Sequence, residues 1–190
     1  KPPEGKYILF MMHKQPENST TSASPTWVDQ EKILEQLAIF APYGIKVVVK
    51  EHPSNYAQRP KDYYNNLYKL PNIYLLHPTV PNNNLIKKAT AIFALNGSIG
   101  VEGIVNKKLV ATLGKPYYSR FGLTKQLNQP KDIYKYLKKS DNLDDKKIEL
   151  FLASYLKSIY HMGELREDGI WPKDEDGGKY FSKALNNFLN

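Results

Sequence analysis

Several polar side chains follow short apolar runs, at the points where α/β proteins commonly carry their chemistry. His52 follows the run Ile45–Lys50 (IKVVVK) and lies between Glu51 and Pro53. Pro53 favours an extended backbone at His52, which holds the imidazole at the end of the run. A histidine there can donate a hydrogen bond to a phosphate oxygen, and Lys50 adds positive charge. The pattern predicts an anion-binding group, with a structural or merely exposed histidine as the alternative.

A glycine-rich turn follows the run Ala91–Leu95 and reads Asn96-Gly97-Ser98-Ile99-Gly100-Val101-Glu102-Gly103. Glycines permit close approach of the backbone to a ligand, and the first amides of the following helix favour an anion. The Ser98 hydroxyl adds a donor, and Glu102, one turn along the same helix face, suits the two hydroxyls of a ribose. The turn predicts a phosphate and ribose contact, although it is neither a GxGxxG nor a GxxxxGK[ST] sequence.

Two further loops follow apolar runs and are candidates to line the same cleft. The first contains His13, Gln15 and Glu17 and continues into a Ser/Thr-rich stretch at residues 18–24. The second carries Tyr117 and Tyr118, whose rings could stack on a base or a sugar. A solvated loop is the alternative for the first, and packing between the sheet and the final helices is the alternative for the second.

The apolar runs are the elements that must position these residues. They are nearly continuous in apolar character, which is typical of strands covered on both faces, and they span Tyr7–Met12, Ile45–Lys50, Asn72–Leu76, Ala91–Leu95 and Leu109–Thr112. Helical patterns lie between and after them: from Ser24-Pro25 to Ala41, Arg59–Leu70, Pro81–Lys88, after Ser98, Pro130–Lys139, Asp144–Met162 and Lys179–Leu189, with an irregular loop at Gly163–Gly178. The alternation predicts a Rossmann-like α/β fold, a parallel sheet of about five strands with helices on both faces.

Length and composition limit the classes of protein that fit. The 190 residues suit one domain over residues 1–190, with residues 130–190 as its helical extension, and the start at Lys1 without Met predicts a piece of a longer chain. There is no cysteine for a disulfide or a thiolate zinc site, and no histidine or acid cluster predicts a metal. The net charge of +8 comes almost entirely from lysine. It indicates the codon bias of an AT-rich genome or contact with an acidic membrane rather than nucleic-acid recognition, which favours arginine.

Together, the motifs resemble the capsule polysaccharide synthesis glycosyltransferases, a family that includes transferases of the sugar acid Kdo. The matching segments are HKQPENSTT after the first run, VVVKEHP at the second, and NNLIKKATAIFALNGSIGVEGIVNKKLVATLGKPYY further on. The resemblance covers about Tyr7–Tyr118 and implies the C-terminal, nucleotide-binding half of a two-domain GT-B enzyme. An N-terminal domain would then supply much of the acceptor site for a saccharide or a lipid-linked saccharide.

The resemblance also implies roles for individual residues. His52 and Ser98 would contact the donor phosphate, together with Lys50, Pro53, Gly97, Ile99 and Gly100, and Glu102 would lie near the ribose. His13, Gln15, Glu17, Tyr117 and Tyr118 would line the cleft, with Glu17 and His52 as the catalytic candidates. This sequence departs from the family in having Asn96-Gly97-Ser98 where Asn-Ser or Ser-Ser is usual.

The resemblance implies a bacterial enzyme of the cytoplasm, at the inner face of the cell membrane, that needs no cofactor besides a CMP- or UDP-linked sugar. The fragment alone is expected to bind a nucleotide but to transfer no sugar. Three alternatives remain open: a nucleotide-sugar 2-epimerase, a polyol-phosphate polymerase of the teichoic-acid type, and a non-catalytic module of a larger surface-carbohydrate protein.

Overall fold

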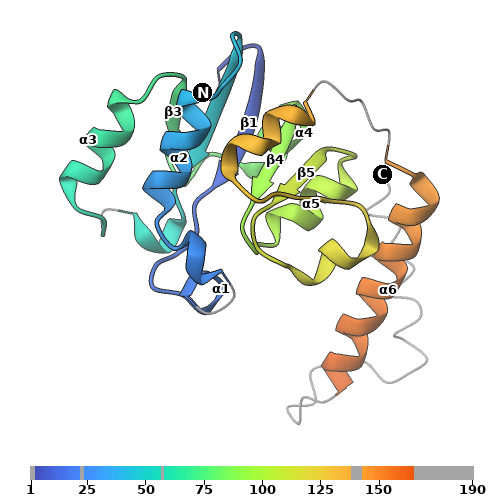
Figure 1. Ribbon diagram of the computed structural model, residues 1–190. Helices are drawn as coiled ribbons and strands as arrows, with labels where there is room; N and C mark the ends of the chain where they lie inside the picture. The colour runs from blue at the N-terminus through green and yellow to red at the C-terminus, as the bar shows by residue number, and fades with distance from the viewer. Residues whose placement is uncertain (1–2, 22–23, 57, 138–142, 165–190) are drawn as a thin grey trace. The chain divides into compact units, whose positions relative to one another are not determined.

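A parallel β-sheet lies at the centre of the fold (Figure 1). The computed structural model describes residues 3–21, 24–56, 58–137 and 143–164. The strands are β1 (Lys6–Met11), β2 (Ile45–Lys50), β3 (Ile73–Leu76), β4 (Ala91–Ala94), β5 (Leu109–Thr112) and β6 (Lys125–Gln126). They pair in the order β3-β2-β1-β4-β5-β6, and every pair is parallel. This is the strand order of the Rossmann fold.

The strand order reverses between β1 and β4. From β1 the chain builds outward to β2 and β3, and then returns to place β4 on the other side of β1. The connection that follows β1 and the connection that follows β4 run in opposite directions. A crevice therefore forms between them, outside the carboxyl ends of these two strands. The sheet therefore provides a ligand-binding position at the ends of β1 and β4.

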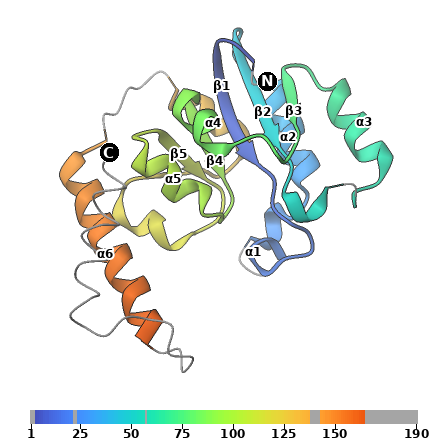
Figure 2. The ribbon, with the colours of Figure 1, turned by 180° about the vertical axis from the view of Figure 1, so that it is seen from behind.

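Helices cover both faces of the sheet. They are α1 (Asn18–Thr21), α2 (Gln30–Ile39), α3 (Lys61–Lys69), α4 (Asn82–Lys88) and α5 (Ile99–Val105), with short 3-10 helices η1 (Pro25–Trp27), η2 (Pro53–Asn55), η3 (Tyr117–Phe121) and η4 (Pro130–Lys135). The helices α2 and α3 pack on one face together with η4, whereas α4 and α5 pack on the other, which Figure 2 shows from behind.

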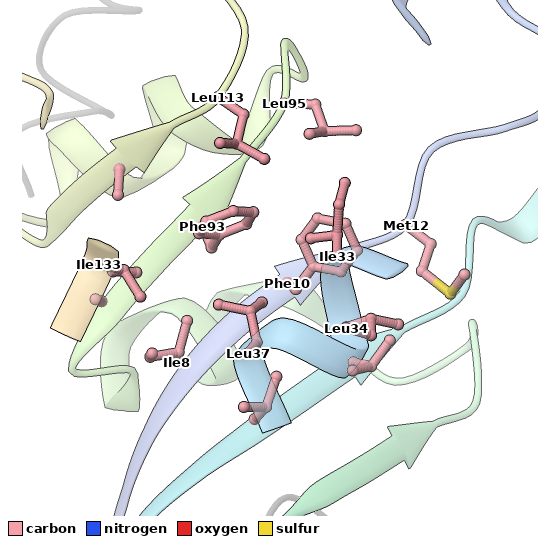
Figure 3. Close-up of a cluster of buried hydrophobic side chains, with 14 of the residues drawn as sticks. Ile8, Phe10, Met12, Ile33, Leu34, Leu37, Phe93, Leu95, Leu113 and Ile133 are labelled. Carbon is pink, nitrogen blue, oxygen red and sulfur yellow. The ribbon is translucent and has the colours of Figure 1, made fainter. Parts of the chain in front are cut away.

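The core on the α2 face joins all the central strands (Figure 3). Phe10 of β1 and Phe93 of β4 meet edge to face with ring centroids 5.6 Å apart. Side chains of α2, including Leu34 and Leu37, cover them, and Ile133 closes the cluster from η4. Each fully buried side chain of this kind contributes about 1.5–3 kcal/mol through removal of apolar surface from water. The core therefore fixes β1, β2 and β4, whose ends carry the candidate residues.

The structure confirms the Rossmann-like α/β fold and corrects several local predictions. The helix expected from Ser24-Pro25 divides into η1 and α2, because the Asp29 side chain accepts a hydrogen bond from the Lys32 amide (3.2 Å) and so caps a new helix. The first part of the expected helix Pro130–Lys139 is the 3-10 helix η4, and residues 138–139 lie outside the described residues. A sixth strand, β6, pairs with the edge of β5.

The contacts divide the chain into two compact units, Lys1–Leu143 and Asp144–Asn190. The described part of the second unit is the helix α6 (Asp145–Glu164), in which the rings of Phe151 and Tyr155 stack at 5.9 Å. The single domain over residues 1–190 stays a prediction. The first two residues of the expected irregular loop Gly163–Gly178 belong to α6, so the loop was predicted to begin too early. The rest of that loop and the expected helix Lys179–Leu189 lie outside the described residues. Within the described residues, no helix combines the length and apolar character needed to cross a membrane.

Candidate functional site

A cavity of about 340 Å³ opens at the carboxyl ends of β1, β2 and β4. Its position coincides with the reversal of strand order, where α/β sheets bind ligands. The lining residues come from four stretches of the chain, 11–17, 50–53, 82 and 97–102: Met11, Met12, His13, Glu17, Lys50, Glu51, His52, Pro53, Asn82, Gly97, Ser98, Ile99 and Glu102. The strand-end residues singled out in the sequence therefore largely meet in one place.

Most of the predicted site residues line this cavity, and four do not. The predicted residues at the cavity are His13, Glu17, Lys50, His52, Pro53, Gly97, Ser98, Ile99 and Glu102. Gln15, Gly100, Tyr117 and Tyr118 lie outside its lining. The cavity also contains residues that the sequence did not single out: Met11, Met12, Glu51 and Asn82.

His52 is held at the end of β2 in a defined orientation and tautomer. Its backbone is extended (φ −69°, ψ 131°), as the following proline favours. The Ser54 amide donates a hydrogen bond to His52 Nδ1 at 3.2 Å. Because Nδ1 accepts this bond, the proton of the neutral ring lies on Nε2. The half-buried imidazole thus carries a hydrogen-bond donor at Nε2.

His13 lies at the end of β1 and is only 6% exposed. Its ring packs against Gly97, where an added Cβ would lie 3.1 Å from His13 Cε1. The Gln30 side chain of α2 fixes the His13 backbone: His13 N–H donates to Gln30 Oε1 (2.8 Å), and Gln30 Nε2 donates to the His13 carbonyl (3.1 Å). Burial lowers the pKa of His13, His52 lowers it further, and Glu17, whose Oε2 lies 3.9 Å from His13 Nδ1, opposes both.

Lys50 and Glu102 place opposite charges on another part of the cavity wall. Lys50 is 7% exposed and donates a hydrogen bond from Nζ to Asn82 Oδ1 at the start of α4. Burial lowers the pKa of Lys50, and the nearby Glu102 carboxylate counteracts this shift. Burial also raises the pKa of Glu102, which Lys50 in turn counteracts. The cavity therefore holds a partly desolvated cation, the Lys50 ammonium, which could form a strong charge-assisted hydrogen bond with a bound anion.

A buried ion pair fastens the loops that follow β1 and β2. Arg59 Nε donates to Glu51 Oε2 at 2.6 Å, and the two side chains are 8% and 6% exposed. The same guanidinium donates to the His13 carbonyl (3.0 Å) and to Gln15 Oε1 (3.0 Å). Glu51 Oε1 accepts from the His52 amide at 2.7 Å. One ion pair thus sets the positions of both cavity histidines, and it explains why Gln15 serves the loop rather than the cavity.

The sequence offered only a weak signal for this pair. Glu51 stands within the KEHP segment, but a single acid after a strand is usually solvated. For Arg59 the sequence predicts only the start of a helix, because nothing in its local sequence indicates the long-range contacts with the loop after β1.

The aromatic loop supports the Gly97–Ser98 turn instead of lining the cavity. Tyr118 is fully buried, and its hydroxyl donates to the Gly97 carbonyl at 2.8 Å. Its ring lies against Gly100, where an added Cβ would overlap the phenol. Burial raises the pKa of Tyr118. Tyr117 packs edge-on against Tyr118, with ring centroids 5.3 Å apart, and remains 50% exposed.

The lowered pKa of His13 predicts a pH-dependent stability. Burial holds the pKa of His13 below its ordinary value of 6.5 in the folded state. Near and below that pH, His13 therefore binds a proton more readily in the unfolded chain than in the folded chain. The His13 contribution is therefore fully present above pH 6.5 and is lost as the pH falls through and below that value. Urea unfolding at several pH values should show a smaller loss between pH 7 and pH 5 for His13→Gln than for the unaltered protein; parallel profiles would contradict this.

The described residues contain no group of three or more His, Cys, Asp or Glu side chains that could hold a metal ion. The cavity contains two histidines, a lysine, three carboxylates and a glycine-containing turn before a helix. These groups suit a ligand that carries both an anionic group and hydroxyls.

Solved structures with a similar fold include a Kdo transferase and a UDP-GlcNAc 2-epimerase. KpsC from Thermosulfurimonas dismutans, a beta Kdo 2,7 transferase, is 20% identical with a TM-score of 0.58, over 80% of this chain and 47% of that one. UDP-GlcNAc 2-epimerase from Neisseria meningitidis, solved with UDP-GlcNAc, is 18% identical with a TM-score of 0.52, over 80% of this chain and 44% of that one. At such identities the similarity concerns the fold. This chain spans less than half the length of either protein.

None of the curated proteins matches the sequence. A family model described as "Capsule polysaccharide biosynthesis protein" matches residues 4–161, which is most of the chain. The match confirms the resemblance found in the sequence and includes every residue of the cavity. This chain belongs to the capsule polysaccharide biosynthesis protein family and has the Rossmann-like fold of one half of a GT-B enzyme.

Proposed function

We propose that this chain is the nucleotide-sugar-binding half of a glycosyltransferase that builds a bacterial capsule or related surface polysaccharide. The observation that supports this most strongly is the cavity at the switch point of the sheet, lined by Lys50, His52, Ser98 and Glu102. The proposal assigns to this cavity a donor that consists of a sugar linked to CMP or UDP, with no further cofactor and no metal.

Several polar groups of the cavity have a role in this proposal. His52 Nε2 and the Lys50 ammonium bind the donor phosphate, together with the backbone of the turn Gly97–Ile99. These donors stabilise the charge that develops on the leaving phosphate as the bond to the sugar breaks. Glu102 accepts hydrogen bonds from the ribose hydroxyls. Glu17, beside His13 at the cavity, and His52 remain the candidates for a catalytic role.

The acceptor belongs to a second domain in this proposal. Glycosyl transfer needs an acceptor hydroxyl held close to the donor, and commonly a general base. We propose that an N-terminal GT-B domain supplies the site for a saccharide or lipid-linked acceptor, and that the chain described here binds the donor but transfers no sugar alone. Sugar transfer by this chain to a saccharide acceptor would contradict that. Epimerisation of a nucleotide sugar without an acceptor would instead favour the 2-epimerase alternative.

Calorimetric titration of this chain with CMP, UMP, UDP and GDP tests the assignment of the cavity. One nucleotide is expected to bind saturably, and His52→Ala should weaken its binding about 10- to 100-fold, because a hydrogen bond to a charged group contributes about 1.5–3 kcal/mol. Lys50→Met should weaken binding comparably by removing the buried cation.

His77→Ala provides the matched control. His77 is exposed, follows β3 rather than β2, and lies outside the lining of the cavity. Its removal should leave nucleotide affinity unchanged. Equal losses in His52→Ala and His77→Ala, or binding that neither His52→Ala nor Lys50→Met affects, would overturn the assignment and favour a non-catalytic module.

We also propose that the protein works in the cytoplasm and associates peripherally with the inner face of the bacterial cell membrane. The net charge of +8 supports this, because the cytoplasmic leaflet carries anionic lipids that attract lysine-rich surfaces.

A further inference from the structure

Large apolar side chains crowd the last residue of α2 and the exposed loop that connects α2 to β2. Ile39 is 65% exposed, Phe40 is 51% exposed and Tyr43 is completely exposed. A single exposed apolar residue is ordinary in a folded protein, but a cluster within one loop indicates a contact surface. The loop lies at the amino-terminal edge of the sheet, opposite the edge that carries the cavity.

Lysines surround this apolar loop. Ile45 is the first residue of β2 after the loop, and Lys6 of β1 lies beside it in the register of the two strands. Lys46 follows Ile45 in the same strand. From η4, Lys131 places its ammonium 4.7 Å from the centre of the Phe40 ring. Of these cations, Lys131 contacts the loop itself, whereas the Lys46 ammonium donates to the Glu4 carbonyl (2.9 Å) and lies 5.1 Å from the centre of the Tyr74 ring at the same edge.

The same edge carries further lysines because all the strands are parallel. Each helix that precedes a strand must end at this edge, and α3 and α4 end in Lys69 and in Lys87-Lys88. Favourable interaction with the helix dipole accounts for part of this enrichment. The acids of the neighbouring segments include Glu4, which is exposed, Glu35, one turn before Ile39 in α2, and Asp132, which is bound to Lys135 at 2.7 Å. The charge of the edge is therefore strongly positive.

We propose that this edge, consisting of the apolar loop Ile39–Tyr43 and its surrounding lysines, docks on an anionic lipid bilayer. Tyr43 and Phe40 would lie among the headgroups, where aromatic side chains are favoured at membranes, and the lysines would contact lipid phosphates. The inference rests on the membrane association proposed above and assigns it to a surface. It leaves the cavity facing away from the bilayer and open to a nucleotide donor.

Sedimentation with lipid vesicles tests the surface. The protein is expected to partition into vesicles of phosphatidylcholine mixed with phosphatidylglycerol, much less into phosphatidylcholine alone, and less at high salt because salt screens the attraction. The double variant Lys69→Gln, Lys131→Gln should weaken partitioning about 25-fold, since each lysine near an anionic surface contributes about a factor of five. Tyr43→Ser should weaken it further without altering the fold, because Tyr43 is completely exposed.

The double variant Lys14→Gln, Lys61→Gln is the matched control. It removes the same charge from exposed positions at the opposite edge of the sheet, after β1 and at the start of α3. It should partition nearly as well as the unaltered protein. In Tyr43→Trp, the new indole should be quenched by brominated lipid, which reports contact of this loop with the bilayer.

Equal losses of vesicle partitioning in the two lysine double variants, or an indole in Tyr43→Trp that is not quenched, would overturn the assignment of this surface. Membrane association itself would then remain in place. No partitioning of the unaltered protein into the anionic vesicles would overturn both. Neither result bears on the nucleotide titration, whose variants lie at the cavity.

Discussion

Arg59→Ala is expected to lower the free energy of unfolding by about 3–5 kcal/mol, the largest effect of any substitution considered for this protein. The change removes the guanidinium that lies 2.6 Å from Glu51 and leaves that carboxylate, which is 6% exposed, without its cation. It also removes the hydrogen bonds to the His13 carbonyl and to Gln15 Oε1. Urea unfolding followed by circular dichroism measures the loss.

Two comparisons separate the buried charge from a general loss of contacts. Lys135→Ala breaks an ion pair of similar length, 2.7 Å to Asp132, but Lys135 is exposed, so stability should change little. The double variant Arg59→Met, Glu51→Leu should recover part of the loss, because no charge is then left buried. An effect of Arg59→Ala no larger than that of Lys135→Ala would contradict the role of the pair.

Arg59 and Glu51 show where the sequence stops predicting the site. The strand-end rule needs only local information: an apolar run ends, and its next residues lie at the carboxyl edge. His13, Lys50, His52 and Ser98 were found in this way, and all four line the cavity. The ion pair depends instead on which loop lies beside which after folding, and no local pattern encodes that.

The central strands of the fold could be predicted from the sequence more accurately than the edge strand β6 and the start of α2. The sequence predicts five strands because each is a nearly continuous apolar run, although the edge strand β3 is only partly buried, and the boundaries of β2 and β5 are correct. The strand β6 is two polar residues, Lys125-Gln126, whose pairing with β5 leaves no hydrophobic signature. The start of α2 was predicted too early because Ser24-Pro25 and Asp29 are both good caps. Which of them caps the longer helix is decided by packing.

Tyr118 illustrates the remaining limit on predicting the site. Its place after β5 correctly indicated the rim of the sheet, but a loop residue can point toward the ligand or toward the core. The structure buries Tyr118 completely and binds its hydroxyl to the Gly97 carbonyl. Tyr118 can point toward the core because Gly100 has no side chain and so provides the space that the phenol occupies.

This dependence of Tyr118 on Gly100 gives the second large prediction. Gly100→Ala would place a Cβ on the Tyr118 phenol, at the start of the helix that follows Ser98. Since neither the buried ring nor the short helix has space to move, we expect a loss of about 1–3 kcal/mol in the free energy of unfolding, as for other overpacked cores. Nucleotide binding should weaken as well, because the displaced turn carries Gly97 and Ser98 at the cavity.

A double-mutant cycle with Tyr118→Leu tests this explanation by urea unfolding and nucleotide titration. The smaller side chain should make room for the Cβ, so Gly100→Ala should cost less stability in that background than in the unaltered protein. Tyr118→Leu alone loses the hydrogen bond to the Gly97 carbonyl and should itself be destabilising. Ser98→Ala is the control for stability, since the exposed Ser98 side chain makes no capping hydrogen bond to the helix. Additive effects of Gly100→Ala and Tyr118→Leu would mean that the phenol does not set the position of the turn, and the loop after β5 would then have no part in shaping the cavity.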